Sequence, residues 1–486
     1  EKLFGEVYWT LRHCFEKAAE VDTEEDGDGD GDVPPVLPGY FRMLTLMALH
    51  TFHQVEVDVM ILEVGMGGRY DATNFINHHT NDSNITTVCG VTLLDLDHCR
   101  VLGTTLEEIA WEKGGIFAVD KTGVVPPKPT KASRMEGECV TATDPFSNDD
   151  ATNEHAAKFF VLDSNTSSVI NVLKRCAEIE DMGNEVVSVD TNGTDLRVAM
   201  NHQGLELGLA GEHQYGNANL ALHLCQAISN GITTSNINAN SNSNATPNAT
   251  FHDIMMLEAL SEASWPGRCQ TIQQPDTGTT FFLDGAHTVQ SLTATLQWFA
   301  HATSTPTSTN APTHKQNPNP RVLVFTCGHE RNPVELLLLI HHQYNSTLPN
   351  KSFSRVYFAT ADSTRPSPVS MPHLEDLMRP TPVHPELVVG ASNRTWPETL
   401  GSVWNHLTAR PSHGPTNTDE PSFKRGTVHC NGTATRILHD LRTNSVPART
   451  QQTQHTQSYD VLVTGSLYLV GSFLTALEWS EESYHP

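Results

Sequence analysis

The sequence has 486 residues, enough for two or more domains, and a formal net charge of -26. An acidic chain repels polyanions at long range, so this balance argues against nucleic-acid binding. Hydrophobic residues make up only 38%, which is low for a compact enzyme and indicates polar insertions. The nine cysteines lack the spacing of a metal site and suggest reduced thiols in an intracellular compartment. The sequence shows neither a recognisable signal peptide nor an apolar run long enough to span a membrane.

The first predicted elements are a helix and a buried strand. Tyr40–Phe52 is mostly apolar and follows a Pro-Gly pair, which predicts a helix. Val59–Leu62 is a short apolar run, typical of a strand covered on both faces. Glu63 ends this run directly before a glycine-rich turn. Because open α/β sheets bind ligands at the carboxyl ends of their strands, Glu63 is a candidate metal ligand; alternatively, it caps the turn.

A second predicted strand leads to another group of polar residues. Ile85–Leu93 is rich in β-branched residues, and Asp95-Leu96-Asp97-His98 follows it. If the two strands are neighbours, His98 and Glu63 face one crevice. Magnesium prefers oxygen ligands but tolerates an imidazole, which Asp97 could orient. The alternative is that His98 is a loop residue or helix cap.

A short helix is predicted to begin at Thr105 and to include Trp111, with Lys113 in its last turn before Gly114-Gly115. An ordinary helix-end lysine is one interpretation. The other is a partly buried lysine with a lowered pKa, which could react as a neutral amine.

Strands and helices alternate in both halves of the chain, which predicts two α/β units. Their junction is expected at Trp265-Pro266-Gly267-Arg268, giving domains over residues 1–265 and 266–486. The other predicted helices are Asn217–Ile228 and Val289–Ala300, and the other predicted strands are Phe281–Leu283, Arg321–Thr326, Val356–Ala359 and Val461–Thr464. Polar stretches expected to be insertions or disordered loops are 22–35, 126–154, 233–250, 303–320 and, with interruptions, 410–458.

Seven segments, in this order, resemble the folylpolyglutamate synthases, which belong to the ATP-dependent Mur ligase superfamily. The segments are GYFRMLTLMALHTF, VDVMILEVGMGGRYDATNFI, DLDHCRVLGTTLEEIAWEKGGIF, GEHQYGNANLAL, WPGRCQ, FFLDGAHTVQS and VLVTGSLYLVG. Any one of them is weak evidence, but together they span most of the chain. The form DGAHT, with Thr288 after His287, resembles the eukaryotic synthases. The resemblance implies a P-loop-type central domain over 1–265, incomplete at its start, and a smaller Rossmann-like domain over 266–486.

The resemblance also implies roles for residues at matching positions. Glu63 and His98 match magnesium ligands, and Lys113 matches a lysine that many relatives carbamylate, which would make it a ligand for a second magnesium ion. Arg268 matches a residue that contacts nucleotide phosphate. Asp284 and His287 match residues near the nucleotide, and Asn217 would shape the nucleotide pocket unless it only caps a helix. For Gly465-Ser466 a tight turn is the preferred interpretation.

One departure from the family is important. The P-loop of these ligases ends in Gly-Lys-Ser/Thr and cradles phosphates with its amides and lysine. This sequence contains no Gly-Lys dipeptide and no Ser-Pro-His folate loop, and it starts at Glu1 rather than at a methionine. We expect the first strand and both loops to have been lost or to lie upstream. The sequence is then either a fragment or a defective copy.

The function implied is ATP-dependent addition of L-glutamate to the γ-carboxyl of tetrahydrofolate through an acyl phosphate, impaired here by the missing P-loop. Alternatives are a non-catalytic relative that binds nucleotide or a partner, and a dihydrofolate synthase or other Mur-type amide ligase. The expected small molecules are ATP, folate, L-glutamate and magnesium ions, and the resemblance also allows a monovalent cation. We expect a monomer without nucleic-acid or membrane partners, in the cytoplasm, the mitochondrion or both.

Overall fold

The computed structural model describes residues 2–25, 37–75, 87–117, 158–177, 185–236, 254–304, 319–329, 331–347, 353–360, 395–408, 427–443 and 458–480. Among the helices described there, none combines the length and apolarity needed to cross a membrane. The chain divides into two compact units. Unit 1 comprises Glu1–Asp190 and Leu220–Asn244, and unit 2 comprises Thr191–Asn219 and Ala245–Pro486.

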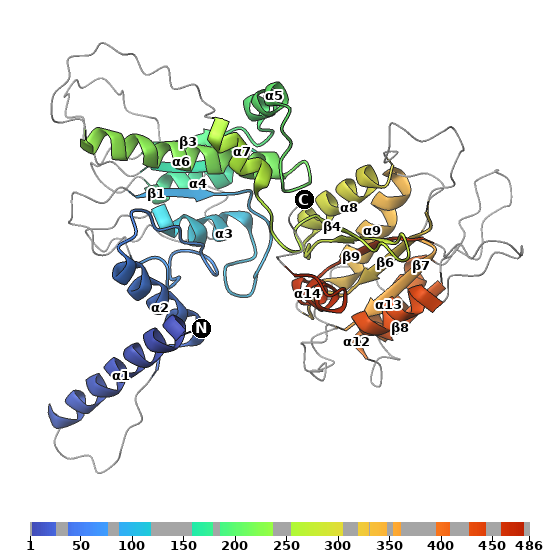
Figure 1. Cartoon of the computed structure of the whole chain (residues 1–486), viewed down its shortest axis with the longest axis horizontal. Coiled ribbons are helices and arrows are strands. Elements are labelled where there is room, and N and C mark those ends of the chain that lie inside the picture. Colours follow the sequence, from blue (N-terminus) through green and yellow to red (C-terminus); the bar gives the residue numbers. More distant parts are fainter. Residues whose placement is uncertain are drawn as a thin grey trace, which may run out of the picture. The chain divides into compact units, whose positions relative to one another are not determined.

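Unit 1 contains a parallel sheet of three described strands in the order β1-β2-β3, of which β1 and β3 are labelled in Figure 1. Its elements are α1 (Lys2–Glu25), α2 (Tyr40–Val55), β1 (Val88–Val91), α3 (Leu106–Lys113), the 3-10 turn η2 (Gly114–Phe117), β2 (Lys158–Leu162), α4 (Ser167–Ala177) and β3 (Glu185–Val189). Helix α6 (Gln214–Asn236) begins in unit 2 and continues into unit 1.

The central strand β2 is buried on both faces because its side chains alternate between two cores. Phe159 and Val161 pack with α3, η2 and α4, whereas Phe160 and Leu162 pack with α6. This period of two is what a strand between two helical layers requires.

Unit 2 contains a six-stranded sheet in the order β4-β5-β9-β6-β7-β8. All pairings are parallel except that of β4 with β5, which is antiparallel. The elements of unit 2 are α5 (Thr194–Gln203), α7 (Ile254–Glu262), β4 (Gln270–Gln273), β5 (Thr280–Leu283), α8 (Val289–Ala302), β6 (Arg321–Phe325), α9 (Pro333–Thr347), β7 (Arg355–Ala359), α12 (Trp396–Leu407), β8 (Thr427–Gly432), α13 (Ala434–Thr443), β9 (Asp460–Thr464) and α14 (Leu467–Ala476).

Helices cover both faces of this sheet. On one face, Leu323 and Phe325 of β6 belong to a core shared with α8, α9 and α12. On the other face, Val322 and Val324 belong to a core shared with α13 and α14. Unit 2 is therefore a three-layer α/β/α unit, and the predicted α/β fold class is confirmed. The boundary predicted after residue 265 falls between α7 and β4 and stays a prediction.

Most of the predicted elements are confirmed. The four C-terminal strands correspond to β5, β6, β7 and β9, the second predicted strand is β1, and the predicted helices are α2, α3, α6 and α8. The polar stretch 410–458 contains β8 and α13, whose Ile437, Leu438 and Leu441 are buried, so this part is structured. The other polar stretches lie mostly outside the described residues.

The predicted strand at Val59–Leu62 is wrong. These residues form no strand, and the Ile61 side chain is 88% exposed. An apolar run becomes a buried strand only where neighbouring strands pair with it, and in the described part of unit 1 no strand pairs with this segment. Glu63 consequently follows a mostly exposed segment without regular secondary structure and is itself exposed.

Candidate functional site

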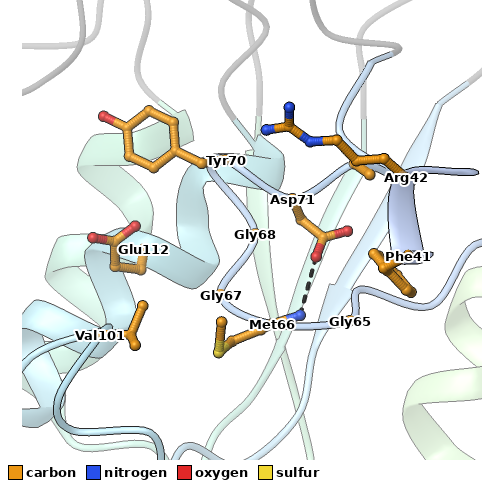
Figure 2. A pocket seen from close by; sticks show the side chains of 11 residues that line it. Phe41, Arg42, Gly65, Met66, Gly67, Gly68, Tyr70, Asp71, Val101 and Glu112 are labelled. Atoms are coloured by element: carbon orange, nitrogen blue, oxygen red, sulfur yellow. Dashed lines mark hydrogen bonds between the residues drawn. The ribbon is translucent and has the colours of Figure 1, made fainter. Parts of the chain in front are cut away.

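The glycine-rich loop after Glu63 is held in shape by Asp71. One carboxylate oxygen of Asp71 accepts hydrogen bonds from the backbone N–H and the hydroxyl of Thr73, at 3.0 and 2.7 Å. The other accepts the N–H of Met66 at 3.0 Å (Figure 2). Burial on its own would raise the pKa of Asp71, but these bonds outweigh burial and hold the pKa below its usual value.

The same loop packs tightly on the end of α3. The N–H of Arg69 donates to the carbonyl of Glu112 at 2.8 Å, and the guanidinium donates to the carbonyl of Trp111 at 3.0 Å and lies over its ring. A Cβ at Gly68 would lie 2.7 Å from the carbonyl oxygen of Lys113, so only glycine allows this approach. The loop therefore fixes the helix end that carries Lys113.

A pocket opens beside this loop. It has a volume of about 530 Å³ and mixes apolar walls with polar groups (Figure 2). Its lining includes Phe41, Arg42, Met66, Tyr70, Asp71 and Glu112. None of the three predicted metal residues lines it. The pocket was not predictable from the sequence, because Phe41 and Arg42 come from α2, a helix with no binding motif of its own.

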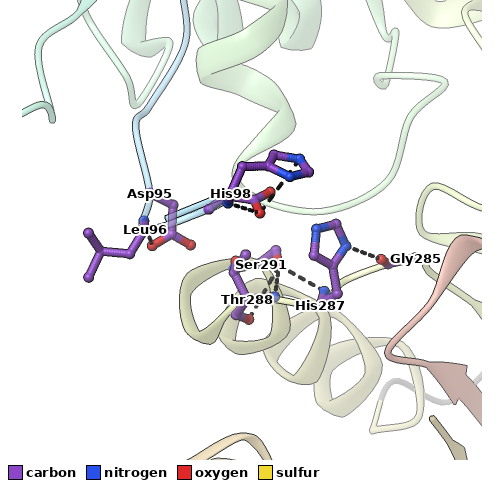
Figure 3. Close-up of polar contacts among 8 residues, drawn as sticks. Asp95, Leu96, His98, Gly285, His287, Thr288 and Ser291 are labelled. Atoms are coloured by element: carbon purple, nitrogen blue, oxygen red, sulfur yellow. Dashed lines mark hydrogen bonds and ion pairs between the residues drawn. The ribbon is translucent and has the colours of Figure 1, made fainter. Parts of the chain in front are cut away.

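The exit of β1 brings Asp97 close to two of the predicted residues. Asp97 accepts the N–H of His98 at 2.6 Å, and its carboxylate lies 3.7 Å from the Nε2 atom of His98 (Figure 3). His98 has a left-handed backbone with φ 51°, a conformation that costs energy for a residue other than glycine. Such strained residues cluster at functional sites, although strain alone does not establish one.

Lys113 lies within electrostatic range of the same carboxylate. Burial lowers the pKa of Lys113, and Asp97 opposes this by favouring the charged form. A lowered pKa at this helix end agrees with the prediction of an amine that can become neutral. Asp97 therefore contacts His98 directly and acts on Lys113 electrostatically.

Glu63 is not part of this group in the structure as described. No recorded hydrogen bond or ion pair joins it to His98 or Lys113 among the described residues. Within that same part of the chain, no group of three or more His, Cys, Asp or Glu side chains is arranged to hold a metal ion. The metal site at Glu63, His98 and Lys113 stays a prediction.

In unit 2, Asp284 is the centre of a buried hydrogen-bond network at the end of β5. Its side chain is only 7% exposed. One oxygen accepts the N–H of Cys269 at 2.8 Å, and the other accepts the N–H of Ala286 at 2.9 Å and the hydroxyl of Thr295 at 2.8 Å. Asp284 thus connects the Arg268-Cys269 turn to the loop before α8. The pKa of the Cys269 thiol is raised by its burial and by the nearby Asp284 carboxylate.

The other predicted residues of unit 2 lie around this network. A Cβ at Gly285 would lie 3.0 Å from a guanidinium nitrogen of Arg268, which places that cation beside the β5 exit. The Nδ1 atom of His287 lies 3.1 Å from the carbonyl oxygen of Gly285 (Figure 3). Thr288 caps α8 by accepting the N–H of Ser291. Arg268, Asp284 and His287 therefore gather at one strand end.

Two further residues of the GEHQYGNA segment have defined surroundings. The amide of Asn217 donates to the side-chain oxygen of Gln214 at 3.1 Å, which is a contact within the first turn of α6. His213, which the sequence analysis did not single out, lies in electrostatic range of Asp284 and Arg268. Desolvation and the Arg268 cation lower the pKa of His213, and Asp284 opposes them. Only the fold brings His213 to the β5 exit.

The two α/β units carry the ordered motifs by which the sequence resembles the Mur ligases. No protein-family model matches the chain. By sequence it is 32% identical over 353 residues to the mitochondrial folylpolyglutamate synthase of Bos taurus, covering 70% of this chain and 48% of that protein. It is 32% identical over 349 residues to the mitochondrial enzyme of Homo sapiens, with the same shares of the two chains. The chain is related by sequence to the folylpolyglutamate synthases and spans about half the length of the curated relatives it matches.

Among solved structures, the folylpolyglutamate synthase of Thermotoga maritima has a TM-score of 0.48 and 18% identity, covering 98% of this chain and 76% of that chain. This structural similarity is too low to support a relationship, so the relationship rests on sequence similarity to the eukaryotic relatives. They include a Saccharomyces cerevisiae folylpolyglutamate synthase, 30% identical over 328 residues, covering 68% of this chain and 46% of that protein.

Proposed function

We propose that this chain carries the catalytic core of a ligase that adds L-glutamate to the γ-carboxyl of tetrahydrofolate. In this reaction the γ-carboxylate attacks the γ-phosphoryl group of ATP and ADP leaves. The amine of glutamate then attacks the acyl phosphate and inorganic phosphate leaves. The observation that carries the proposal is the Asp97 carboxylate at the β1 exit, which contacts His98 and acts electrostatically on the partly buried Lys113, in a chain related by sequence to folylpolyglutamate synthases.

The donor set at the β1 exit is compatible with a magnesium ion. Magnesium keeps several waters and takes only one or two protein ligands beside substrate phosphates, so a complete protein cage is not required. His98 and Glu63 would hold the ion, and Asp97 would orient the imidazole. When bound, the ion would neutralise charge on the phosphates.

Lys113 fits the role of a carbamylated residue because burial favours its neutral amine. Only the neutral amine captures carbon dioxide, and the product is a carboxylate-like group. The packing of Gly68 and Arg69 on the same helix end would hold this group in place.

In unit 2 we assign the nucleotide to the β5 exit. Arg268 would pair with phosphate oxygens through its planar guanidinium. His287 would lie near the nucleotide, and Asn217 would shape the pocket through the first turn of α6. Asp284 would contribute mainly by holding the loops that carry Arg268 and His287, since three protein donors already engage its oxygens.

The pocket of unit 1 is our candidate site for the ring portion of the acceptor. Phe41, Met66 and Tyr70 offer apolar and aromatic surface for a flat heterocycle. Arg42 and Glu112 add polar groups at its edge. This combination suits an aromatic acceptor better than a purely polar one.

We expect the polypeptide as printed to be weakly active on its own. It has no Gly-Lys dipeptide and hence no P-loop lysine to hold the phosphates. Losing the amides and the lysine that bind the phosphates should raise the activation free energy of phosphoryl transfer by about 3 kcal/mol or more, by analogy with other lost electrostatic donors. A non-catalytic relative that binds nucleotide is the second candidate, and the gathering of Arg268, Asp284 and His287 at the β5 exit is the observation that favours it.

The test is incorporation of labelled glutamate into tetrahydrofolate and, in parallel, into dihydropteroate, with ATP and magnesium. The proposal expects ATP-dependent extension of tetrahydrofolate that Lys113→Ala abolishes and added bicarbonate supports. Extension of dihydropteroate alone would replace the acceptor with that of a dihydrofolate synthase. Nucleotide binding without any extension, even at high enzyme concentration, would favour the non-catalytic candidate.

The remaining expectations concern the setting of the protein. The Bos taurus and Homo sapiens relatives carry mitochondrial names, which supports a mitochondrial location, and a cytoplasmic location stays an expectation from the sequence. We also propose that the protein works as a monomer on small molecules, without nucleic acid or membrane. Size-exclusion chromatography with light scattering tests the oligomeric state directly.

A further inference from the structure

Asn165 occupies a position that neither the motifs nor the family relation singles out. It follows β2, in the turn before α4, and its side chain is only 5% exposed. The turn around it is tied to the neighbouring strand, because the N–H of Asp163 donates to the carbonyl of Val189 at the end of β3 at 2.9 Å. Asn165 thus lies where the carboxyl ends of the three described strands of unit 1 meet.

The side-chain amide of Asn165 is fully engaged with backbone groups. Its oxygen accepts the N–H of Leu94 at 2.9 Å. Its nitrogen donates to the carbonyl of Thr92 at 3.2 Å and to the carbonyl of Leu162 at 3.0 Å. These partners also fix the orientation of the amide, since a carbonyl can only accept and an N–H can only donate.

These bonds replace the sheet ladder where it stops. The recorded pairing of β1 with β2 ends at Val91 and Val161, so Thr92 and Leu94 have no strand partners in that ladder. A buried backbone group without a partner is costly, and the amide of Asn165 provides an acceptor for the N–H of the buried Leu94 and a donor for the carbonyl of Thr92. The chain continues from Leu94 directly to Asp95 and His98.

We propose that Asn165 is a positioning residue for segment 95–98, the segment to which we assign the metal. It acts through the backbone of Thr92 and Leu94, and it fixes the direction in which β1 leads to the Asp97–His98 pair. The left-handed backbone of His98 makes such support necessary, because a strained residue keeps its conformation only where its surroundings hold it. The effect on metal binding rests on the proposed function, whereas the effect on the backbone does not.

The test compares Asn165→Ala and Asn165→Asp with Val169→Ala in the full chain. Val169 is fully buried in α4 and belongs to the same hydrophobic core as Leu94. Because its side chain makes no polar contact, Val169→Ala controls for a general loss of stability. Asn165→Asp keeps an acceptor for Leu94 but turns a carboxylate oxygen toward the carbonyls of Thr92 and Leu162. The two readouts are amide hydrogen exchange of peptides covering 92–102 and the affinity for Mn²⁺ measured by electron paramagnetic resonance.

The proposal expects exchange at 92–102 to accelerate about tenfold in both Asn165 variants beyond any change in Val169→Ala. It also expects Mn²⁺ affinity to fall about tenfold, as when a group that orients a ligand is removed. If exchange at 92–102 accelerates only as much as exchange in the rest of unit 1, the proposal is wrong. If the unmodified chain does not bind Mn²⁺, the proposed metal site fails, and the exchange data alone still decide the role of Asn165.

Discussion

Removing the carboxylate of Asp284 tests whether this residue holds the β5 exit together. In Asp284→Ala, the N–H groups of Cys269 and Ala286 lose their acceptor, whereas the hydroxyl of Thr295 can still donate to the carbonyl of Ser291 at 3.0 Å. Each buried donor without a partner costs about 1–3 kcal/mol, so the loss of two acceptor contacts should reduce the unfolding free energy by about 2–6 kcal/mol. Asp284→Asn keeps one acceptor and should lose about 1–3 kcal/mol.

The assay is urea unfolding followed by tryptophan fluorescence, since Trp298, Trp396 and Trp404 are buried in unit 2. Thr295→Val is the matched control. It removes one of the three donors and leaves both backbone bonds to Asp284, so it should cost about 1 kcal/mol. If Asp284→Ala unfolds within about 0.5 kcal/mol of the unmodified chain and only nucleotide affinity falls, then Asp284 is a direct ligand and our reasoning is wrong.

Four further predictions concern unit 1. Ile61→Ser should change the unfolding free energy by less than about 0.5 kcal/mol because the side chain is 88% exposed. A loss of about 2 kcal/mol or more in urea unfolding would instead show that Ile61 is buried, as the predicted strand at Val59–Leu62 requires. Competitive acylation read by mass spectrometry should give Lys113 a titration midpoint below the usual 10.5, and Asp97→Asn should lower it further; a midpoint at 10.5 would contradict its burial. Since the folded pKa of Lys113 lies below its unfolded value, its contribution to stability should increase as pH rises from the folded pKa to 10.5, and Lys113→Met should remove this increase in urea unfolding. Iodoacetamide should modify the exposed Cys99 and spare Cys89, whose pKa burial raises to about 12; equal labelling of both would contradict the packing of β1.

The fold of unit 2 was largely predictable because its strands are continuous apolar runs. Val322 and Leu323 face opposite cores, so burial on both sides leaves a strong signal in the sequence. The same signal was misleading at Val59–Leu62, because sequence shows apolar character but not whether a neighbouring strand covers it. β8 was missed for the opposite reason, since its residues resemble the polar stretches around them.

The candidate site was predictable where the chemistry is local. Lys113 lies at a helix end and His98 follows a strand, and both positions can be read from flanking residues. Their approach to Asp97 depends on how α3 packs on the sheet, which periodicity does not specify. Asn165 was missed because a single buried amide has no sequence signature, and only the positions of its three partners give it a role.

The most direct test of the account is a crystal structure of the chain grown with Mn²⁺, bicarbonate and a non-hydrolysable ATP analogue. Anomalous scattering locates the metal independently of the refined atoms. The account predicts a manganese peak within bonding distance of the His98 imidazole and the Glu63 carboxylate, with a carbamate on Lys113. A peak elsewhere, or Glu63 on the opposite side of unit 1 from His98, would contradict it.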